Sequence, residues 1–322
     1  MSIALIGGAG FVGTRLALTL DKSNKKYRIF DKTLADEKYI DITKPETFDN
    51  LRNVTTIINL AAEHRDDVSP KSLYDQVNVE GSENLCNFCR ENNVNNIVFT
   101  SSVAVYGFAP KGTNESGEIN YFNDYGRTKY LAEEVYRKWH AEDPKNRNLT
   151  IVRPTVIFGE ANRGNVYNLL HQISSGKFLM FGDGKNRKSM AYVQNVAEFL
   201  QFSTALKGYN LYNYIDKPDL DMNTLVSTIR KTLFNKDGVG PRFPAWLGHL
   251  AGYGFDILAF AIRTKLPISS IRVKKFMGTT AFSTSVSASG FKPSVSLEEG
   301  LKRTLNYEFI EDNSDKKTFL TE

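Results

Sequence analysis

Short apolar runs alternate with longer segments of helical periodicity along the first 154 residues. The apolar runs cover residues 3–7, 27–31, 55–62, 96–102 and 149–154. Each has the length and continuity of a strand that is buried on both faces. Between them, apolar side chains recur at helical spacing, as at Val12, Leu16 and Leu20, and residues 70–92 and 124–140 are predicted helices. This alternation predicts an α/β fold with a parallel sheet covered on both faces.

The pattern is less regular after Pro154. Helices are predicted at residues 165–176, 193–206 and 224–234, and a short strand at 212–215. Such a mixture of loops and short elements is typical of a smaller substrate-binding lobe. The end of the chain, residues 309–322, is predicted to be a polar, mobile tail.

Composition and charge narrow the class of protein. The chain has 322 residues, of which 41% are hydrophobic and 24% charged, as in a globular protein with a large core. The net charge is +5 and the basic residues are dispersed, which argues against nucleic-acid binding but allows a modest attraction to phosphates or an anionic membrane. Residues 2–8 read as a strand and turn rather than a signal peptide, so a cytoplasmic location is expected.

The two cysteines, Cys86 and Cys89, have the Cys-x-x-Cys spacing of redox and metal sites. They lie within a helical pattern, and the sequence contains no second cysteine pair. We therefore favour buried free thiols in a reducing compartment and predict no metal site.

A glycine-rich stretch, "GGAGFVG", lies between the first predicted strand and the first helix. Its glycines allow a tight turn and let backbone N–H groups approach a pyrophosphate at the helix N-terminus. The predicted dinucleotide-binding residues of this stretch are Gly7, Gly10, Phe11, Val12 and Gly13. The strand before and the helix after supply the context that such a motif requires.

Asp31 ends the second strand, where a carboxylate accepts hydrogen bonds from the adenosine ribose. It would also repel a 2′-phosphate, so NAD is favoured over NADP, although Lys32 slightly weakens that preference. Asp41 and Ile42 are candidates to flank the adenine. A surface-turn role for Asp41 is the alternative.

The sequence "YGRTK" places Tyr125 and Lys129 four residues apart, on one face of a predicted helix. A neighbouring ammonium favours the phenolate, so we expect a lowered pKa for Tyr125 and a role as general base. Ser102, at the end of the fourth strand, is expected to hydrogen-bond the substrate oxygen and relay its proton. Turn or cap chemistry is the alternative role for Ser101 and Ser102.

Together these residues resemble the extended short-chain dehydrogenase/reductase family, in its NAD-dependent epimerase/dehydratase branch. The resemblance also rests on "NLAA" at 59–62, "NVEGSENL" from Asn78 and "RPTVIFGE" from Arg153. It implies a doubly wound Rossmann domain that holds NAD at 1–160, with some later segments joining its core, and a smaller C-terminal α/β lobe at 161–308. It further implies that the cofactor pocket is lined by Ala61, Ala62, Asn78, Ser101 and Pro154.

Family members bind a diphosphate-linked sugar in the smaller lobe. By that resemblance the candidate substrate residues are Ser102, Val103, His64, Asn165, Arg187, Lys188 and Arg272. Lys188 supplies charge but lacks the two-pronged geometry of arginine, for which Arg187 or Arg272 could compensate. A solvated surface role remains the alternative for the three cations, and a salt-bridging surface loop for His64.

Longer phrases, among them "LAAEHRDDVSP" and "YNYIDKPDLDMN", are similar to family members that invert C4 of N-acetylglucosamine on undecaprenyl diphosphate for O-antigen synthesis. In the implied mechanism, Tyr125 removes the C4 hydroxyl proton, NAD takes and returns the hydride, and a 4-keto sugar forms in between. A UDP-sugar 4-epimerase is the close alternative. A 4-keto-sugar reductase and a non-catalytic NAD-sensing regulator are the more distant ones, and a homodimer is expected.

Residues 243–262 form a nearly uncharged stretch that is long enough to cross a bilayer. Asp256, Pro244 and three glycines argue against a membrane span. A buried helix pair is one expectation. The other is an interfacial surface anchored by Trp246 and Tyr253, through which the protein would contact a membrane peripherally.

Overall fold

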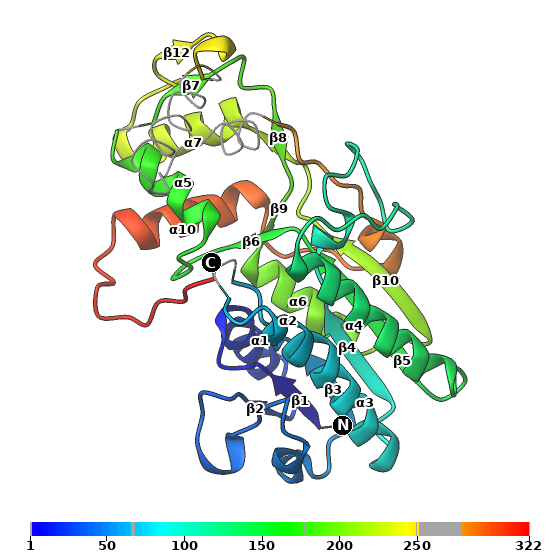
Figure 1. Ribbon diagram of the computed structural model, residues 1–322. Coiled ribbons are helices and arrows are strands. Elements are labelled where there is room, and N and C mark those ends of the chain that lie inside the picture. Colours follow the sequence, from blue (N-terminus) through cyan, green and yellow to red (C-terminus); the bar gives the residue numbers. More distant parts are fainter. Residues whose placement is uncertain (1, 66–67, 177, 249, 251–277, 322) are drawn as a thin grey trace.

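The computed structural model describes residues 2–65, 68–176, 178–248, 250 and 278–321. Its centre is a six-stranded sheet with the order β10-β5-β4-β3-β1-β2, in which every neighbouring pair is parallel (Figure 1). The strands are β1 (Ile3–Ile6), β2 (Tyr27–Phe30), β3 (Thr56–Asn59), β4 (Asn96–Thr100), β5 (Asn148–Pro154) and β10 (Tyr209–Tyr214). The strand order reverses between β1 and β3, as in a doubly wound Rossmann sheet. The predicted fold class is therefore confirmed.

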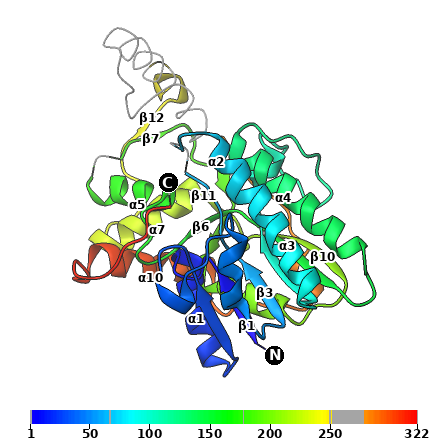
Figure 2. The ribbon, with the colours of Figure 1, turned by 60° about the horizontal axis from the view of Figure 1, so that its bottom comes forward.

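Helices cover both faces of the sheet. On one face α1 (Phe11–Lys22) packs against α6 (Val193–Ser203) over a core that includes Leu16 and Phe199. On the other face lie α3 (Gly81–Glu91) and α4 (Asp124–Ala141), which Figure 2 shows side by side and away from α1. Because α6 and β10 come from the later half of the chain, that half completes the large sheet and its helical cover.

Strand β10 differs from its prediction. The sequence pattern predicted a short strand at 212–215 within the smaller lobe, whereas the strand begins at Tyr209 and pairs with β5 along its whole length. Its first four residues are only partly buried or exposed, since β10 is the edge strand of the sheet. The run of apolar residues that marks a strand in the sequence was therefore weak over the first part of β10.

The predicted helix at 70–92 is confirmed as a continuous helical segment over residues 72–91, but its geometry changes along its length. A short turn of helix, α2 (Ser72–Tyr74), leads into a wider π-helical segment, η3 (Asp75–Glu80), before α3 begins. Asn78 is buried within this wider segment. Cys86 and Cys89 are on the buried side of α3 and are free thiols, as predicted. Burial raises the pKa of Cys86 to about 12.

The C-terminal lobe packs α5 (Asn165–Ser174), α7 (Met222–Phe234) and α10 (Leu297–Phe309) around a separate core that includes Leu170, Val226 and Leu301. Short paired strands complete it: β6 (Val156–Phe158) with β9 (Met190–Tyr192), β8 (Arg187–Lys188) with β11 (Leu220–Asp221), and β7 (Met180–Phe181) with β12 (Arg242–Phe243). In Figure 1 this lobe stands above and to the left of the large sheet.

The sequence analysis did not predict α10, although a signal for it is present. Ser296 accepts a hydrogen bond from the backbone N–H of Glu299 at 3.2 Å, which is the N-terminal half of a capping box. Leu297, Leu301 and Leu305 follow at four-residue spacing and are buried.

The apolar stretch at 243–262 lies mostly outside the described residues, and so does Tyr253. In the described part, Trp246 and Leu250 are more than 60% exposed. Among the residues that the structure describes, no helix is both long enough and apolar enough to cross a bilayer.

Candidate active site

The candidate residues meet at one edge of the large sheet. The glycine loop follows β1, Asp31 follows β2, Ala61 follows β3, Ser102 follows β4, and Pro154 ends β5. Carboxyl ends of parallel strands lie at the same edge, so the topology gathers side chains that are far apart in sequence. This edge faces the C-terminal lobe (Figure 1).

The glycine loop fits a dinucleotide cradle. Gly7 has φ +76°, and a Cβ there would stand 2.7 Å from the backbone nitrogen of Ala61. A Cβ on Gly13 would stand 2.5 Å from the Cα of Gly8, so larger residues would push apart the loop and the helix. Gly10 is the N-cap of α1 and has no side chain to occupy the space in front of the helix. The N–H groups of the first helical turn and the helix dipole there suit a pyrophosphate.

The Asp31 carboxylate is held beside this loop. Oδ2 accepts from the backbone N–H of Ala9 at 3.1 Å, and Oδ1 accepts from the backbone and hydroxyl of Thr33 at 3.0 and 2.9 Å. Lys32 is exposed. The carboxylate is thus oriented where the adenosine ribose of a dinucleotide is expected.

Asp41 and Ile42 have the contacts of structural residues. The Asp41 carboxylate accepts from the backbone N–H and the hydroxyl of Thr43 at 3.0 and 2.8 Å, as in an Asx turn. The Ile42 side chain is only 4% exposed and packs in the core under Gly81. These contacts correspond to the surface-turn alternative for Asp41.

Tyr125, Lys129 and Ser102 are brought together as predicted. Tyr125 and Lys129 are one turn apart on α4, whose first turn is capped by Asn123 accepting from Gly126 at 2.9 Å. The Ser102 hydroxyl is hydrogen-bonded to Tyr125. Ser102 also accepts from the backbone N–H of Ala104 at 3.1 Å, so cap chemistry and contact with Tyr125 coexist in one side chain.

The pKa of Tyr125 is shifted opposite to the expectation. Burial raises it, and the hydrogen bond from Ser102 only partly opposes that rise. Burial also lowers the pKa of Lys129 to about 7, against the opposing charge of Glu133. The expectation assumed a fully charged ammonium, but a buried lysine with a pKa near 7 carries its proton only part of the time at neutral pH.

A buried charge network behind Lys129 was missed by the sequence analysis. Glu133, which is fully buried, accepts from Arg153 Nε at 2.7 Å and from Arg137 Nη2 at 2.6 Å. Arg153 also donates to the hydroxyl of Tyr106 at 2.6 Å. The signal for Glu133 was its place on α4, four residues after Lys129, which extends the Tyr125–Lys129 face by one more turn.

Ser101 and Asn78 have hydrogen bonds that support this site. The Ser101 hydroxyl donates to Glu133. Asn78 accepts from the Glu63 backbone N–H at 2.8 Å and donates to Thr128 Oγ1 at 2.9 Å. Asn78 thereby ties the loop after β3 to the helix that carries Lys129.

The remaining cofactor and substrate candidates of the large domain lie near the carboxyl ends of β3, β4 and β5. Ala61 donates its backbone N–H to Asn59, and Pro154 is buried at the end of β5. Ala62 and Val103 are half-buried, and His64 is exposed near the carbonyl of Ala62.

In the C-terminal lobe, Asn165 begins α5, and Arg187 and Lys188 form β8. Lys188 donates from Nζ to the Gly278 carbonyl at 2.7 Å, and burial lowers its pKa to about 8. Arg272 lies outside the described residues. The two described cations are consecutive on one strand, so their side chains point to opposite faces; Lys188 is partly buried and Arg187 is exposed.

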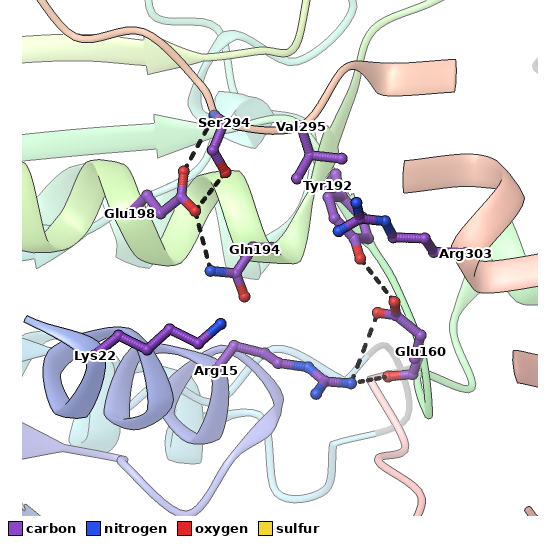
Figure 3. Close-up of a pocket in the computed structure, with 9 residues that line it drawn as sticks. All are labelled: Arg15, Lys22, Glu160, Tyr192, Gln194, Glu198, Ser294, Val295 and Arg303. Carbon is purple, nitrogen blue, oxygen red and sulfur yellow. Dashed lines mark hydrogen bonds and ion pairs between the residues drawn. The ribbon is translucent and has the colours of Figure 1, made fainter. Parts of the chain in front are cut away.

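Two hollows adjoin the elements of the site. One, of about 460 Å³, lies at the start of α4 and is lined by Val68, Lys71, Tyr74, Tyr121, Phe122, Asn123, Asp124 and Arg127. The other, of about 260 Å³, lies between α1, α6 and α10 (Figure 3). There Glu160 holds Arg15 and Tyr192, with the Tyr192 hydroxyl 2.7 Å from its carboxylate. This second hollow belongs to the α1–α6 face of the sheet, opposite the α4 face that carries Tyr125.

Comparison with known proteins identifies the class. The model of the NAD dependent epimerase/dehydratase family matches residues 3–211, and the chain belongs to that family. The family's cofactor is NAD, which agrees with the glycine cradle and Asp31.

Among curated relatives, the N-acetyl-alpha-D-glucosaminyl-diphospho-ditrans,octacis-undecaprenol 4-epimerase of Escherichia coli O157:H7 is 47% identical over 100% of this chain and 99% of its own length. The UDP-glucose 4-epimerase of Vibrio cholerae is 27% identical, and the match covers 94% of each chain. Among solved structures, the Thermotoga maritima UDP-glucose 4-epimerase with UDP-glucose has a TM-score of 0.72 at 20% identity, over 95% of this chain and 98% of that chain. This last similarity shows the fold.

Proposed function

We propose that this protein inverts C4 of N-acetylglucosamine carried on diphospho-undecaprenol. The observation that carries the proposal is the full-length similarity, at 47% identity, to an enzyme named for that reaction. The hydrogen-bonded Ser102–Tyr125 pair, with Lys129 one turn away, provides groups able to move a proton at a sugar hydroxyl. A regulator that only senses NAD would have no use for these three groups together.

In this proposal Tyr125 takes the proton of the C4 hydroxyl, with Ser102 holding the same oxygen. NAD, held by the glycine loop and Asp31, would supply the hydride acceptance and return that inversion at C4 requires. In its protonated form Lys129 supplies positive charge that favours the Tyr125 phenolate, and it holds the nicotinamide ribose. After the 4-keto sugar has turned its other face, Tyr125 returns the proton, so the protein's own groups end in their starting state.

The glycine loop and Asp31 would hold the dinucleotide, with Ala61, Ala62 and Pro154 beside it. Asn165, Arg187 and Lys188 would hold the diphosphate from the C-terminal lobe. Burial lowers the pKa of Lys188 to about 8, and an anion bound at its Nζ would stabilise the charged form of the side chain.

The lipid part of the proposed substrate suggests a role for a group of exposed apolar side chains in the C-terminal lobe. Leu179, Phe243, Trp246 and Leu250 lie on or beside the paired strands β7 and β12, and each is 36% exposed or more. We propose that this surface contacts the cytoplasmic face of a membrane peripherally, where an undecaprenyl-linked sugar would be met. A homodimer completes the proposal and is tested by the mass of the particle in solution.

The experiment offers the purified protein N-acetylglucosamine on diphospho-undecaprenol in detergent and, separately, on UDP, and follows inversion at C4. Conversion of the lipid-linked donor without added NADH is the expected result. Conversion of the UDP sugar alone would instead assign the activity named for the Vibrio cholerae relative. A requirement for stoichiometric NADH would indicate a reductase, and conversion of neither donor would overturn the proposal.

A further inference from the structure

The last residues of the chain do not form a free tail. Residues 316–321, which we call the C-terminal strap, leave α10 and turn back between the two lobes (Figures 1 and 2). The Phe319 backbone N–H donates to the Ala161 carbonyl, and the Arg163 N–H donates to the Phe319 carbonyl, both at 2.8 Å. Thr321 Oγ1 donates to Asn162 Oδ1 at 2.6 Å. The strap is thus paired, residue against residue, with the segment after β6.

This segment is a firm base for the strap. Ala161 and Asn162 are 4% and 5% exposed. Glu308, near the end of α10, accepts from the Ala161 N–H at 2.7 Å and also pairs with Arg163. The helix that leads into the strap therefore also fixes the segment on which the strap rests.

The strap reaches the dinucleotide cradle through two side chains. The Phe319 ring packs on the Phe11 ring, with centroids 5.9 Å apart, and Phe11 is the first residue of α1. Lys317 Nζ lies 3.4 Å from the carbonyl oxygen of Ala9, inside the glycine loop, and 5.1 Å from the centre of the Phe319 ring. One strap residue thus contacts the start of the helix and another contacts the loop.

We propose that the C-terminal strap is part of the NAD site, with Lys317 as a pyrophosphate-directed cation and Phe319 as the anchor that holds it over the glycine loop. The pyrophosphate of a dinucleotide lies at the N-terminus of α1, next to Ala9. An ammonium that now contacts the Ala9 carbonyl gains a stronger partner when an anion arrives. The strap also covers Phe11 and so slows escape of the dinucleotide.

The chain offers a matched control in the neighbouring lysine. Lys316 Nζ lies 5.6 Å from the centre of the Tyr307 ring on α10, so its charge is directed at that helix rather than at the loop. Both lysines are exposed, and they have the same charge and adjacent positions. A difference between them reports location rather than net charge.

The test measures the affinity and the dissociation rate of NAD by calorimetry and stopped-flow fluorescence on the full chain. We expect Lys317→Met to weaken NAD binding about fivefold at low salt, and we expect the difference to shrink as salt rises. Lys316→Met should bind NAD like the wild type. Equal affinity of the two variants at low salt would overturn the role of Lys317.

Phe319→Ser tests the anchor. We expect NAD to dissociate about tenfold faster, with a deficit that persists at high salt because the lost contact is apolar. Phe319→Leu keeps an apolar contact with Phe11 and should restore most of the retention, while thermal unfolding of both variants reports any general loss of folding. Wild-type dissociation from a folded Phe319→Ser variant would show that the strap does not retain the cofactor.

Discussion

The Nζ atom of Lys129 lies 4.3 Å from the centre of the Phe99 ring, within a site where the lysine is only 2% exposed. The aromatic face attracts the ammonium but does not replace the water that the ammonium has lost. Glu133, whose negative charge favours the protonated lysine, is already bonded to Arg153 and Arg137. Lys129 therefore destabilises the folded state.

We therefore predict that Lys129→Met stabilises the protein while it removes activity. Because burial lowers the pKa of Lys129 from 10.5 to about 7, the lysine opposes folding wherever the unfolded chain would protonate it. The free energy of unfolding should rise by about 1–2 kcal/mol at pH 7, and this increase should fade as the pH rises towards 10.5. Chemical denaturation at both pH values checks this, with the exposed Lys138→Met as control. A loss of stability at pH 7 would contradict it.

Replacement of Tyr125 by Phe should reduce turnover by a factor of at least 100, because the group that exchanges the C4 proton is gone. The bound NAD content should remain that of the wild type, since the glycine loop and Asp31 are untouched. Ser102→Ala should reduce turnover by a smaller factor than Tyr125→Phe, because it removes a supporting hydrogen bond. Turnover and cofactor content are measured on the same preparations, and a fully active Tyr125→Phe variant would exclude the proposed proton transfer.

Glu133 and Glu134 allow the buried network to be separated from helix charge. Glu133→Gln leaves Arg153 without its carboxylate in a site that is 2% exposed, so the free energy of unfolding should fall by about 3–5 kcal/mol. Glu134 is 40% exposed and pairs with Arg137, so Glu134→Gln should change it by no more than about 1 kcal/mol. Similar losses of unfolding free energy in both variants, measured with denaturant, would show that the buried network behind Lys129 contributes no more than an exposed ion pair.

Lys188→Met should raise KM for the diphosphate-linked donor about tenfold with little change in kcat, because the lost charge binds substrate and transition state alike. Burial lowers the pKa of Lys188 to about 8, so the free enzyme loses this charge as the pH rises through 8. Lys188→Arg keeps its charge at both pH values. Its affinity for the donor should therefore fall less than that of the wild type between pH 7 and pH 9. The exposed Lys185→Met is the control. An unchanged KM in Lys188→Met would remove this residue from the diphosphate site.

Trp246→Ser should reduce sedimentation with vesicles of anionic lipid at least threefold, because an exposed indole partitions into the headgroup region. Phe234 is also exposed but lies at the end of α7, so Phe234→Ser is a matched loss of aromatic surface elsewhere. Equal binding of the two variants would place the membrane contact, if one forms, away from β12.

Local signals were sufficient for much of the fold and for the candidate residues. Strands β1 to β5, helices α1 and α4, and the order of the glycine loop, Asp31, Ser102, Tyr125 and Lys129 were all predicted from periodicity and spacing. Such features depend on neighbours within one or two helical turns or on one strand, and neighbours at that range can be read directly from the chain.

Other features depend on contacts between distant segments. The edge position of β10, the pairing of Glu133 with Arg153, and the return of Phe319 to Phe11 join residues from different parts of the chain, so local patterns do not predict these contacts. The direction of the Tyr125 pKa shift belongs with them. Spacing predicted a neighbouring charge, but burial in the folded site decides how much of that charge is present and what it costs to ionise the phenol.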